Sequence, residues 1–296
     1  MSYTYPMPKG RKEIEVKPRT LYIVATPIGN LGDITRRAVE TLSKVDLILC
    51  EDTRKSGRLL EHLGIKRELS SYYLFNEAGK LQWVIGKLED GASVAVISAA
   101  GTPLVCDPGY RLVQACIEED INVEVIPGPT AFTTAMLLSG FFERGFHFAG
   151  WIPRKGRERD EVLHYLATIR EPVVFYESTK RVKKTMDDFA KLQPEREAVV
   201  ARELTKLHEE VIRGTCESLA KKLKGKELKG ECVVVLGPSG ESIRFDRGKS
   251  DMVYNYFAVL KRAGMPAGKA AKTVAKLLGL PANDIYRLLV INDEVE

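Results

Sequence analysis

The sequence predicts an α/β fold: two α/β domains, the first built on a parallel sheet, followed by a small C-terminal module that is helical and helix-turn-helix-like. Two observations support this prediction. Short apolar runs alternate with polar turns and with segments of helical spacing, a pattern typical of parallel strands joined by crossover helices. The chain has 296 residues, enough for about two domains at roughly 150 residues each.

We expect the first domain over residues 20–140, behind a flexible basic tail at 1–19. Its apolar runs are short, rich in strand formers, and end at polar or glycine-containing turns. These runs predict strands at 21–25, 47–50, 93–97 and 123–126. Helical spacing predicts helices at 34–43, 59–63, 110–119 and 131–139, the first of them with Asp33 as its N-cap.

A second domain is expected over residues 141–240, where the alternation resumes after a connector. The segment 146–150 opens it, strands are predicted at 173–176, 198–201 and 231–236, and helices near 157–168, 180–191 and 216–224. From 250 to 296 the pattern changes to short amphipathic helices with tight turns, at 253–263, at 267–278 and after a cap at Asn283. Such modules often bind nucleic acid, although small helical bundles that only pack also occur.

Composition narrows the class of protein. The chain is 44% hydrophobic and 29% charged, so it is expected to fold. No apolar run approaches the roughly 18 residues of a membrane span, and no membrane partner is expected. The five cysteines show no C-x-x-C spacing, and the N-terminal segment lacks the apolar core of a signal peptide. Both features favour a cytoplasmic protein without disulfides or zinc.

Charge and absent motifs narrow the function. The net charge of +5 permits a polyanionic partner without requiring one. The P-loop, dinucleotide-binding, zincin and nucleophile-elbow motifs are missing, which argues against nucleotide hydrolysis, nicotinamide chemistry and α/β-hydrolase chemistry. The four histidines lie far apart in the sequence, so no metal site is expected.

Three loops that follow predicted parallel strands form the candidate ligand site, because ligands of open α/β sheets bind at the carboxyl ends of the strands. Each loop combines glycine or proline with a small hydroxyl residue, which lets the backbone approach a ligand closely. Glycine and proline also simply turn a chain, but three such loops at one edge favour a ligand. The loops span residues 25–33, 98–103 and 127–131.

Seven motifs follow one another along about residues 20–237. They are LYIVATPIGNLGDIT at 21–35, CEDTRKS at 50–56, SAAGTPLVCDPGYRLV at 98–113, IPGPTA at 126–131, GWIPRKG at 150–156, FYES at 175–178 and ARELTK at 201–206. In this order they resemble the motifs of the tetrapyrrole methylase family. The resemblance implies that S-adenosylmethionine, the methyl donor, binds in the cleft between two α/β domains of a homodimer. Within the family, the motifs are most similar to a member that methylates the ribose 2′-oxygen of a cytidine in 16S rRNA of the small ribosomal subunit.

The predicted site residues fall into three groups. Donor contacts are expected from Pro27, Gly29, Ser98, Gly101, Thr102, Thr130, Ala131, Glu177 and Ala201. As catalytic residues we favour Glu77, which can accept a proton, and Arg54, which can bind an RNA phosphate. Asp52, Glu177 and Glu203 are the other candidates for the proton acceptor. Each of these carboxylates could equally be a salt-bridge partner. RNA phosphates are expected to contact Arg154, Lys155, Arg202 and Lys206.

Two departures from the family's pattern bear on activity. Ala99 stands where the family usually has aspartate, and Tyr73 and Phe75 stand where it often has histidines. Two alternatives therefore stay open: a methylase of a corrin or haem precursor, and an RNA-binding protein that keeps the donor fold but catalyses weakly. The helical module and the basic segment 153–155 favour RNA over a tetrapyrrole.

Overall fold

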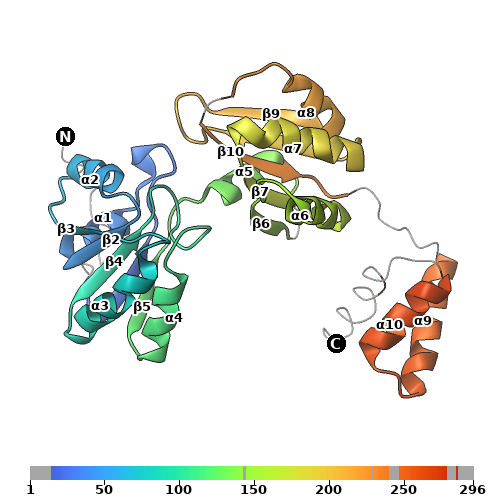
Figure 1. Ribbon diagram of the computed structural model, residues 1–296, viewed down its shortest axis with the longest axis horizontal. Helices are drawn as coiled ribbons and strands as arrows, with labels where there is room; N and C mark the ends of the chain where they lie inside the picture. The colour runs from blue at the N-terminus through green and yellow to red at the C-terminus, as the bar shows by residue number, and fades with distance from the viewer. Residues whose placement is uncertain (1–14, 143–144, 229, 240–246, 279–284, 286–296) are drawn as a thin grey trace, which may run out of the picture. The chain divides into compact units, whose positions relative to one another are not determined.

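The computed structural model describes residues 15–142, 145–228, 230–239, 247–278 and 285. The chain divides into two compact units, Met1–Gly240 and Glu241–Glu296 (Figure 1). The larger unit holds two five-stranded sheets with their helices, and the smaller unit is helical where it is described. The fold class is therefore the one that the sequence predicts.

The first sheet is parallel throughout, as expected from the alternation of strands and helices. Its strands are β1 (Thr20–Val24), β2 (Leu47–Cys50), β3 (Glu68–Ser71), β4 (Ser93–Ile97) and β5 (Asn122–Ile126), in the order β3-β2-β4-β1-β5. Strands β1, β2 and β4 are buried along their whole length, which explains their largely apolar sequences. Because β4, β1 and β5 are neighbours, the loops that follow them leave from one edge of the sheet.

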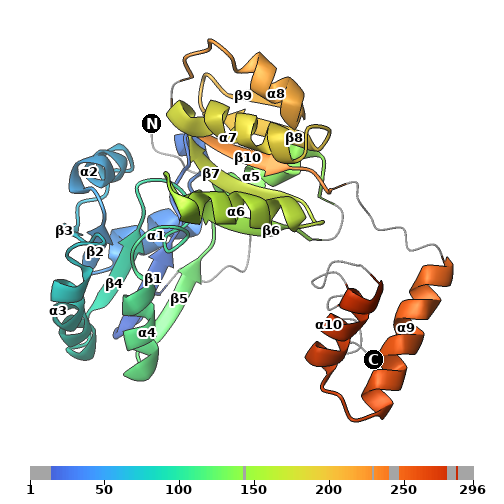
Figure 2. The same ribbon diagram turned by 45° about the vertical axis from the view of Figure 1, so that its right-hand side comes forward.

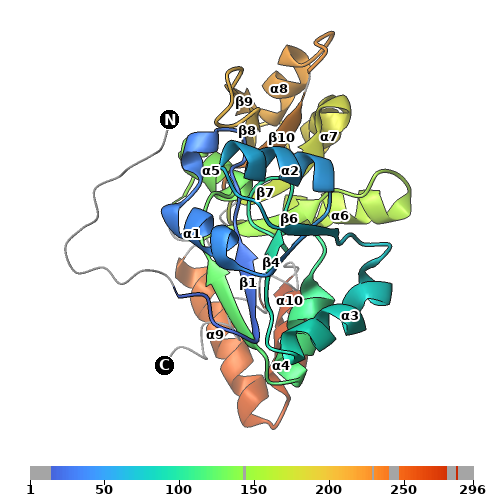
Figure 3. The same ribbon diagram turned by 90° about the vertical axis from the view of Figure 1, so that its left-hand side faces the viewer.

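Helices cover both faces of the first sheet (Figure 3). On one face, α1 (Arg36–Lys44) and α2 (Thr53–His62) bury Leu42 and Leu60 against the strands. On the other, α3 (Glu77–Glu89) and α4 (Tyr110–Glu118) bury Leu88 and Leu112. Successive residues of each strand enter these two cores alternately, so the sheet is sandwiched between helices.

The second sheet is mixed. It consists of β6 (His147–Trp151), β7 (Val173–Ser178), β8 (Glu197–Arg202), β9 (Glu210–Thr215) and β10 (Glu231–Leu236) in the order β6-β7-β10-β8-β9, and only the β6–β7 pairing is parallel. One face packs on α6 (Arg157–Thr168), α7 (Thr179–Leu192) and α8 (Cys216–Lys222) (Figure 2). The other face packs on α5 (Ala131–Ser139), which follows the first sheet in the sequence but belongs to the core of the second.

Several element boundaries differ from the sequence prediction. The N-cap of α1 is Thr35 and not Asp33, because the Thr35 hydroxyl accepts the Ala38 N–H while Asp33 lies in a 3₁₀ turn at Leu31–Asp33. Helix α2 begins well before the predicted 59–63 because Asp52 caps it. Strand β3, helix α3 and strand β9 have no counterpart in the prediction, since β3 and β9 are partly polar and not fully buried.

The smaller unit contains α9 (Arg247–Arg262) and α10 (Ala267–Leu278). Helix α10 agrees with the helix predicted at 267–278, whereas α9 begins six residues before the helix predicted at 253–263. Val253, Phe257, Ala270 and Val274 are buried in a core of its own. The helix predicted after Asn283 and most of the predicted tail, residues 1–14, lie outside the described residues. Within the described part of the chain, no helix is both long and apolar enough to cross a membrane.

Candidate active site

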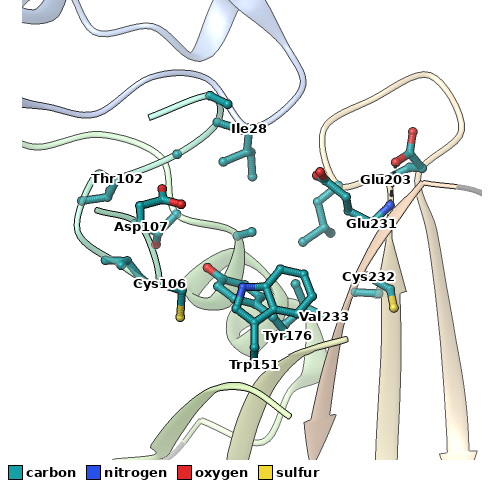
Figure 4. Close-up of a pocket in the computed structure, with 18 of the residues that line it drawn as sticks. Ile28, Thr102, Cys106, Asp107, Trp151, Tyr176, Glu203, Glu231, Cys232 and Val233 are labelled. Atoms are coloured by element: carbon teal, nitrogen blue, oxygen red, sulfur yellow. Dashed lines mark hydrogen bonds between the residues drawn. The ribbon is translucent and has the colours of Figure 1, made fainter. Parts of the chain in front are cut away.

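A cavity of about 250 Å³ lies in the larger unit, where the carboxyl edge of the first sheet faces the second sheet. Its volume is near the lower end of the range of ligand sites, roughly 300–1,000 Å³. Figure 4 shows Thr102 and Asp107 on one side, Glu203 and Glu231 on the other, and Trp151 and Tyr176 between them. We call the first side the loop wall, residues 99–107 and 130–131, and the second side the sheet wall, residues 151, 176, 201–206 and 231–233.

The loop wall is made of small residues held by main-chain bonds. Thr26 and Gly101 form an isolated antiparallel bridge, in which each N–H donates to the other's carbonyl at 2.8 and 3.1 Å. Gly101 has φ +83°, and a Cβ there would meet Ile28 Cγ2 at 3.2 Å. The Thr102 hydroxyl donates to Pro129 O at 3.2 Å and so ties the second loop to the third. The three loops therefore meet at one edge, as the sequence predicts.

Left-handed backbone conformations cluster around the cavity. Leu104 and Cys106 have φ +69° and +64° on the loop wall, and Glu203 and Thr205 have φ +49° and +64° on the sheet wall. Such conformations are rare for residues other than glycine and cost of order 1–3 kcal/mol each, so they persist only where the surroundings impose them. Their concentration in both walls indicates that the walls are shaped for a ligand and not for stability alone.

Aromatic side chains form the base of the sheet wall. The rings of Trp151 on β6 and Tyr176 on β7 lie 5.4 Å apart, and half of the Trp151 surface is exposed. Burial raises the pKa of Tyr176 to about 12, so its hydroxyl stays neutral. This base offers flat apolar surface on which a heterocyclic ring can pack.

The loop after β8 closes one end of the cavity. Lys206 donates to Glu203 at 2.9 Å, and Glu203 also accepts the Glu231 N–H at 3.2 Å. Partial burial opposes ionisation of Glu203, but the bond from Lys206 lowers its pKa. The same loop packs tightly on Gly29, where a Cβ would lie 2.8 Å from Leu204 O and against Lys206 Cγ. Gly29 is thus a point of close approach between the first loop and the sheet wall.

Asp107 is the carboxylate with the most unusual environment in the cavity. Burial, then the neighbouring carboxylates Glu51 and Glu231, raises the pKa of Asp107 to about 6. Within the described residues, its side chain has no hydrogen bond or ion pair. Asp52 is the opposite case, because the N–H groups of Lys55 and Arg54 bind its carboxylate as the cap of α2 and lower its pKa. Asp107 is therefore suited to exchange protons near neutral pH, and Asp52 is not.

Six of the predicted residues line the cavity. They are Gly101, Thr102, Thr130, Ala131, Ala201 and Lys206. Three predicted donor residues are not part of the lining: Pro27 and Gly29 in the first loop, and Ser98. Ser98 is buried and donates to the carbonyls of Ala100 and Gly101 at 3.1 and 3.0 Å, so it supports the second loop.

Two predicted carboxylates lie outside the cavity lining. Glu177 is completely buried, bound to Arg181 at 2.6 Å and to the Thr185 hydroxyl at 2.7 Å. Glu77 is 5% exposed and accepts the Gly109 N–H at 3.1 Å. Through that bond Glu77 anchors the turn that carries Asp107, two residues earlier in the chain.

The remaining predicted cations lie away from the cavity or are paired. Arg54 is 90% exposed on α2, and Arg154 and Lys155 are exposed between β6 and α6. Arg202 binds Glu210 at 2.6 Å across the β8–β9 pair. Arg54 also lies 3.7 Å from Asp52, but its exposure, like that of Arg154 and Lys155, makes it accessible to a polyanion, whereas Arg202 is held in the sheet.

Sequence reasoning missed several lining residues. Glu51 and Lys55 flank the predicted Asp52 and Arg54, and Asp107 lies inside the motif at 98–113, but no pattern in the sequence marks them as facing a cavity. Glu231 enters from β10 of the second sheet, more than a hundred residues further on, and only the packing of the two sheets around the cavity brings it close to Asp107. Among the described residues, no group of three His, Cys, Asp or Glu side chains could hold a metal ion.

Comparison with solved structures defines the class of fold. Uroporphyrin-III C-methyltransferase from Thermus thermophilus, complexed with S-adenyl homocysteine, has a TM-score of 0.53 at 18% identity, covering 76% of this chain and 99% of that one. A diphthine synthase has a TM-score of 0.59 at 13% identity, covering 74% and 89%. At these identities the likeness establishes the fold, that of tetrapyrrole methylases.

Sequence comparison defines the family. The model of the tetrapyrrole (corrin/porphyrin) methylases matches residues 20–220, and the chain belongs to this family. The ribosomal RNA small subunit methyltransferase I of Mesorhizobium japonicum is 42% identical over 285 residues, 95% of each chain. The protein of that name from Thermotoga maritima is 43% identical over 216 residues, which are 73% of this chain and 97% of that protein.

Proposed function

We propose that this chain transfers a methyl group from S-adenosylmethionine to RNA of the small ribosomal subunit, at the ribose 2′-oxygen of a cytidine in 16S rRNA. The observation that carries the proposal is the 42% identity, along 95% of the chain, to a curated rRNA methyltransferase. The cavity supports it, because it combines a main-chain loop wall, an aromatic base and a carboxylate of raised pKa.

The loop wall is suited to hold the donor. Ala99, Ala100, Gly101, Thr130 and Ala131 have small side chains, so that main-chain N–H and C=O groups face a ligand directly. The donor supplies a methyl group already activated on a positively charged sulfur. The chain's task is therefore to align the acceptor hydroxyl with that methyl group and to exclude water.

The charges of the cavity favour a cationic donor. Four carboxylates line it, those of Glu51, Asp107, Glu203 and Glu231, against two amines, those of Lys55 and Lys206. Excess negative charge attracts a sulfonium and repels a ligand that itself carries many carboxylates, as corrin and haem precursors do. We therefore favour RNA over a tetrapyrrole, with a neutral ribose entering the cavity and the phosphates meeting exposed cations such as Arg54, Arg154 and Lys155.

Asp107 is our proposed proton acceptor. As the methyl–sulfur bond breaks and the carbon–oxygen bond forms, the hydroxyl proton passes to the Asp107 carboxylate and later to water. S-adenosylhomocysteine and a 2′-O-methyl nucleotide are the products. A pKa of about 6 leaves this carboxylate ionised at neutral pH yet basic enough to assist a weak nucleophile.

The test is transfer of radiolabelled methyl from S-adenosylmethionine to small ribosomal subunits isolated from a strain that lacks this activity. We expect label in 16S rRNA that withstands alkaline hydrolysis as a 2′-O-methyl dinucleotide. Uroporphyrinogen III, tested as the acceptor in parallel, is expected to remain unlabelled. Label in the tetrapyrrole alone would contradict the proposal, and donor binding without label in either acceptor would identify a donor-fold protein that no longer catalyses.

The proposal extends to organisation and location. We propose domains at 20–140 and 141–240 and a helical module at 250–296, a homodimer, and a cytoplasmic site of action where ribosomal subunits assemble. Light scattering of the purified chain, which reports its mass in solution, tests the homodimer. A mass equal to the 33.0 kDa of one chain would contradict it.

A further inference from the structure

We propose that the helical module is a second RNA-binding surface, in which a row of lysines on α10 contacts phosphates. The row consists of Lys269, Lys272 and Lys276 and is called the lysine row below. The proposal rests on the proposed function for the choice of RNA as the polyanion. It adds a binding site that lies outside the cavity.

Geometry places the three lysines on one side of α10. Their spacing of three and four residues brings successive side chains onto the same helix face. Over seven residues, the row extends about 10 Å at 1.5 Å per residue, roughly the length of three phosphate steps at 3.4 Å each. All three lysines are exposed, and none has an ion pair within the described residues. The row therefore matches a nucleic acid backbone in both spacing and charge.

The opposite face of α10 is already occupied. Ala270, Ala271, Val274 and Ala275 are buried against α9 in the core of the module. A helix that lies in a membrane surface needs its apolar face free to enter the lipid. The burial of this face favours a polyanion in solution over an anionic membrane.

Charge is concentrated in these two helices. The segment 247–278 contains one acidic residue, Asp251, whereas its basic residues are Arg247, Lys249, Lys261, Arg262, Lys269, Lys272 and Lys276. The net charge of the whole chain is only +5, so the remainder of the chain is close to neutral. Residues 279–296 add four acidic residues and one arginine, so the positive charge belongs to α9 and α10 and not to the module as a whole. These two helices are a local concentration of positive charge that can attract RNA.

The module is separate from the proposed chemistry. Every residue that lines the cavity lies within the larger unit. The relative from Thermotoga maritima is matched over 97% of its length by 216 residues of this chain, close to the size of the larger unit. We infer that the module adds affinity for the substrate and takes no part in methyl transfer.

The experiment replaces the three lysines of the row together by glutamine, Lys269→Gln, Lys272→Gln and Lys276→Gln, in the full chain. Glutamine has nearly the helix propensity of lysine, so the helix content and the melting temperature should not change. The matched control replaces Lys221, Lys224 and Lys226, three exposed lysines at the end of α8 and in the turn after it, by glutamine. Both variants lose the same charge.

The first readout is the binding of a fluorescent single-stranded oligoribonucleotide at several salt concentrations. Each phosphate that a lysine neutralises releases about 0.7 counterions, so removing three such lysines should lower the slope of log K against log salt by about 2. The affinity of the row variant near 0.1 M salt should drop at least tenfold. The control variant should keep both the slope and the affinity of the unmodified chain.

The second readout is methyl transfer to small ribosomal subunits. The row variant should show a raised KM, with kcat and the affinity for S-adenosylmethionine unchanged. Unchanged RNA affinity, or an equal loss in the control variant, would overturn the inference. The inference would also be overturned if the row variant lost binding to phosphatidylserine vesicles or to poly-glutamate but kept its affinity for RNA. Because the RNA-binding readout needs no methyl transfer, failure of the proposed function leaves this test valid.

Discussion

The two walls of the cavity are built in different ways. The loop wall consists of small residues whose main chain is fixed by the Thr26–Gly101 bridge and by left-handed conformations at Gly101 and Cys106. The sheet wall consists of large side chains, among them Trp151 and Tyr176, that project from regular strands. A wall made of main chain should tolerate truncation of its side chains but not larger side chains. A wall made of side chains should lose its function when those side chains are truncated.

The difference matches two kinds of ligand recognition. Main-chain groups of the loop wall suit the methyl donor, which is the same molecule in every reaction cycle, because the fold sets the positions of backbone groups. The side chains of the sheet wall and the carboxylate of Asp107 can instead be adapted to an acceptor. Substitutions in the two walls should therefore affect donor binding and turnover separately.

Added bulk at Gly101 should have the largest effect. Gly101→Val places a branched side chain at φ +83° and against Ile28 Cγ2, 3.2 Å from the first added carbon. We expect S-adenosylmethionine binding, measured by calorimetry, to weaken at least a hundredfold. Gly156→Val is the control, because Gly156 has a similar φ of +86° but no atom within 4 Å of its Cβ. Normal donor affinity in Gly101→Val, or an equal loss in Gly156→Val, would show that the loop wall does not hold the donor.

Removal of the proton acceptor should act on turnover alone. We expect Asp107→Asn to lower kcat about a hundredfold, within the range typical of general bases, while the donor affinity stays unchanged. The carboxylate works when ionised, so kcat of the unmodified chain should fall as the pH drops below about 6. That decline should be absent in Asp107→Asn. Asp187→Asn is the control, because it removes an ion-paired carboxylate on the surface of α7, and it should change neither kcat nor the pH profile. An unchanged kcat in Asp107→Asn would show that Asp107 is not the proton acceptor.

The contact between the first loop and the sheet wall can be weakened at a residue outside the cavity lining. Gly29→Ala adds a carbon 2.8 Å from Leu204 O and still closer to Lys206 Cγ, so the loop after β8 must move outward. We expect about a tenfold loss of donor affinity. Gly86→Ala is the matched control, since no atom lies within 4 Å of a Cβ there and alanine favours the interior of helix α3 by about 0.5–1 kcal/mol. Equal donor affinity in both variants would mean that closure of the walls is irrelevant.

Local signals made most of the fold predictable. Continuous apolar runs identified β1, β2 and β4, and helical spacing identified α5, α6 and α10 with their bounds. Strand β3 escaped because its sequence, ELSS, is half-exposed and lacks an apolar run. Helix α3 follows directly on that segment and was missed with it. Edge strands receive part of their stability from a neighbouring strand, which a local pattern does not contain.

The site was less predictable than the fold. Glycine and small residues pointed to the loop wall, because their chemistry acts locally on the main chain. Carboxylates carried no such signal: Asp52, Glu77 and Asp107 all follow strands or precede helices, and only burial and hydrogen bonds distinguish them. The sequence favours Glu77 as the base, and the structure gives it the Gly109 N–H instead. The roles of these three side chains depend on neighbours that are distant in the sequence.

Glu77 offers a test between a base and an anchor. Its Oε1 accepts the buried Gly109 N–H, and a glutamine carbonyl can do the same. Glu77→Gln should therefore keep most of kcat. Glu77→Ala leaves the N–H unsatisfied and should lower the free energy of unfolding by about 1–3 kcal/mol, as urea denaturation would show. If Glu77→Gln were as inactive as Asp107→Asn, Glu77 would itself be the base.

The smallest expected effect is on the stability of the folded protein, which the ionised Asp107 carboxylate lowers. A carboxyl whose pKa is raised by folding destabilises the folded protein once it ionises, so stability declines as the pH rises from about 4 to about 6 and stays lower above that. Asparagine removes this penalty. Solvent at the open side of the cavity screens part of it, so we expect Asp107→Asn to raise Tm by only about 2–4 °C at pH 8, and by less at pH 5. Calorimetric scans at the two pH values measure it. A carboxylate that weakens the fold in which it lies is retained for chemistry, whereas a drop in Tm at pH 8 would mark Asp107 as a structural residue like Glu77.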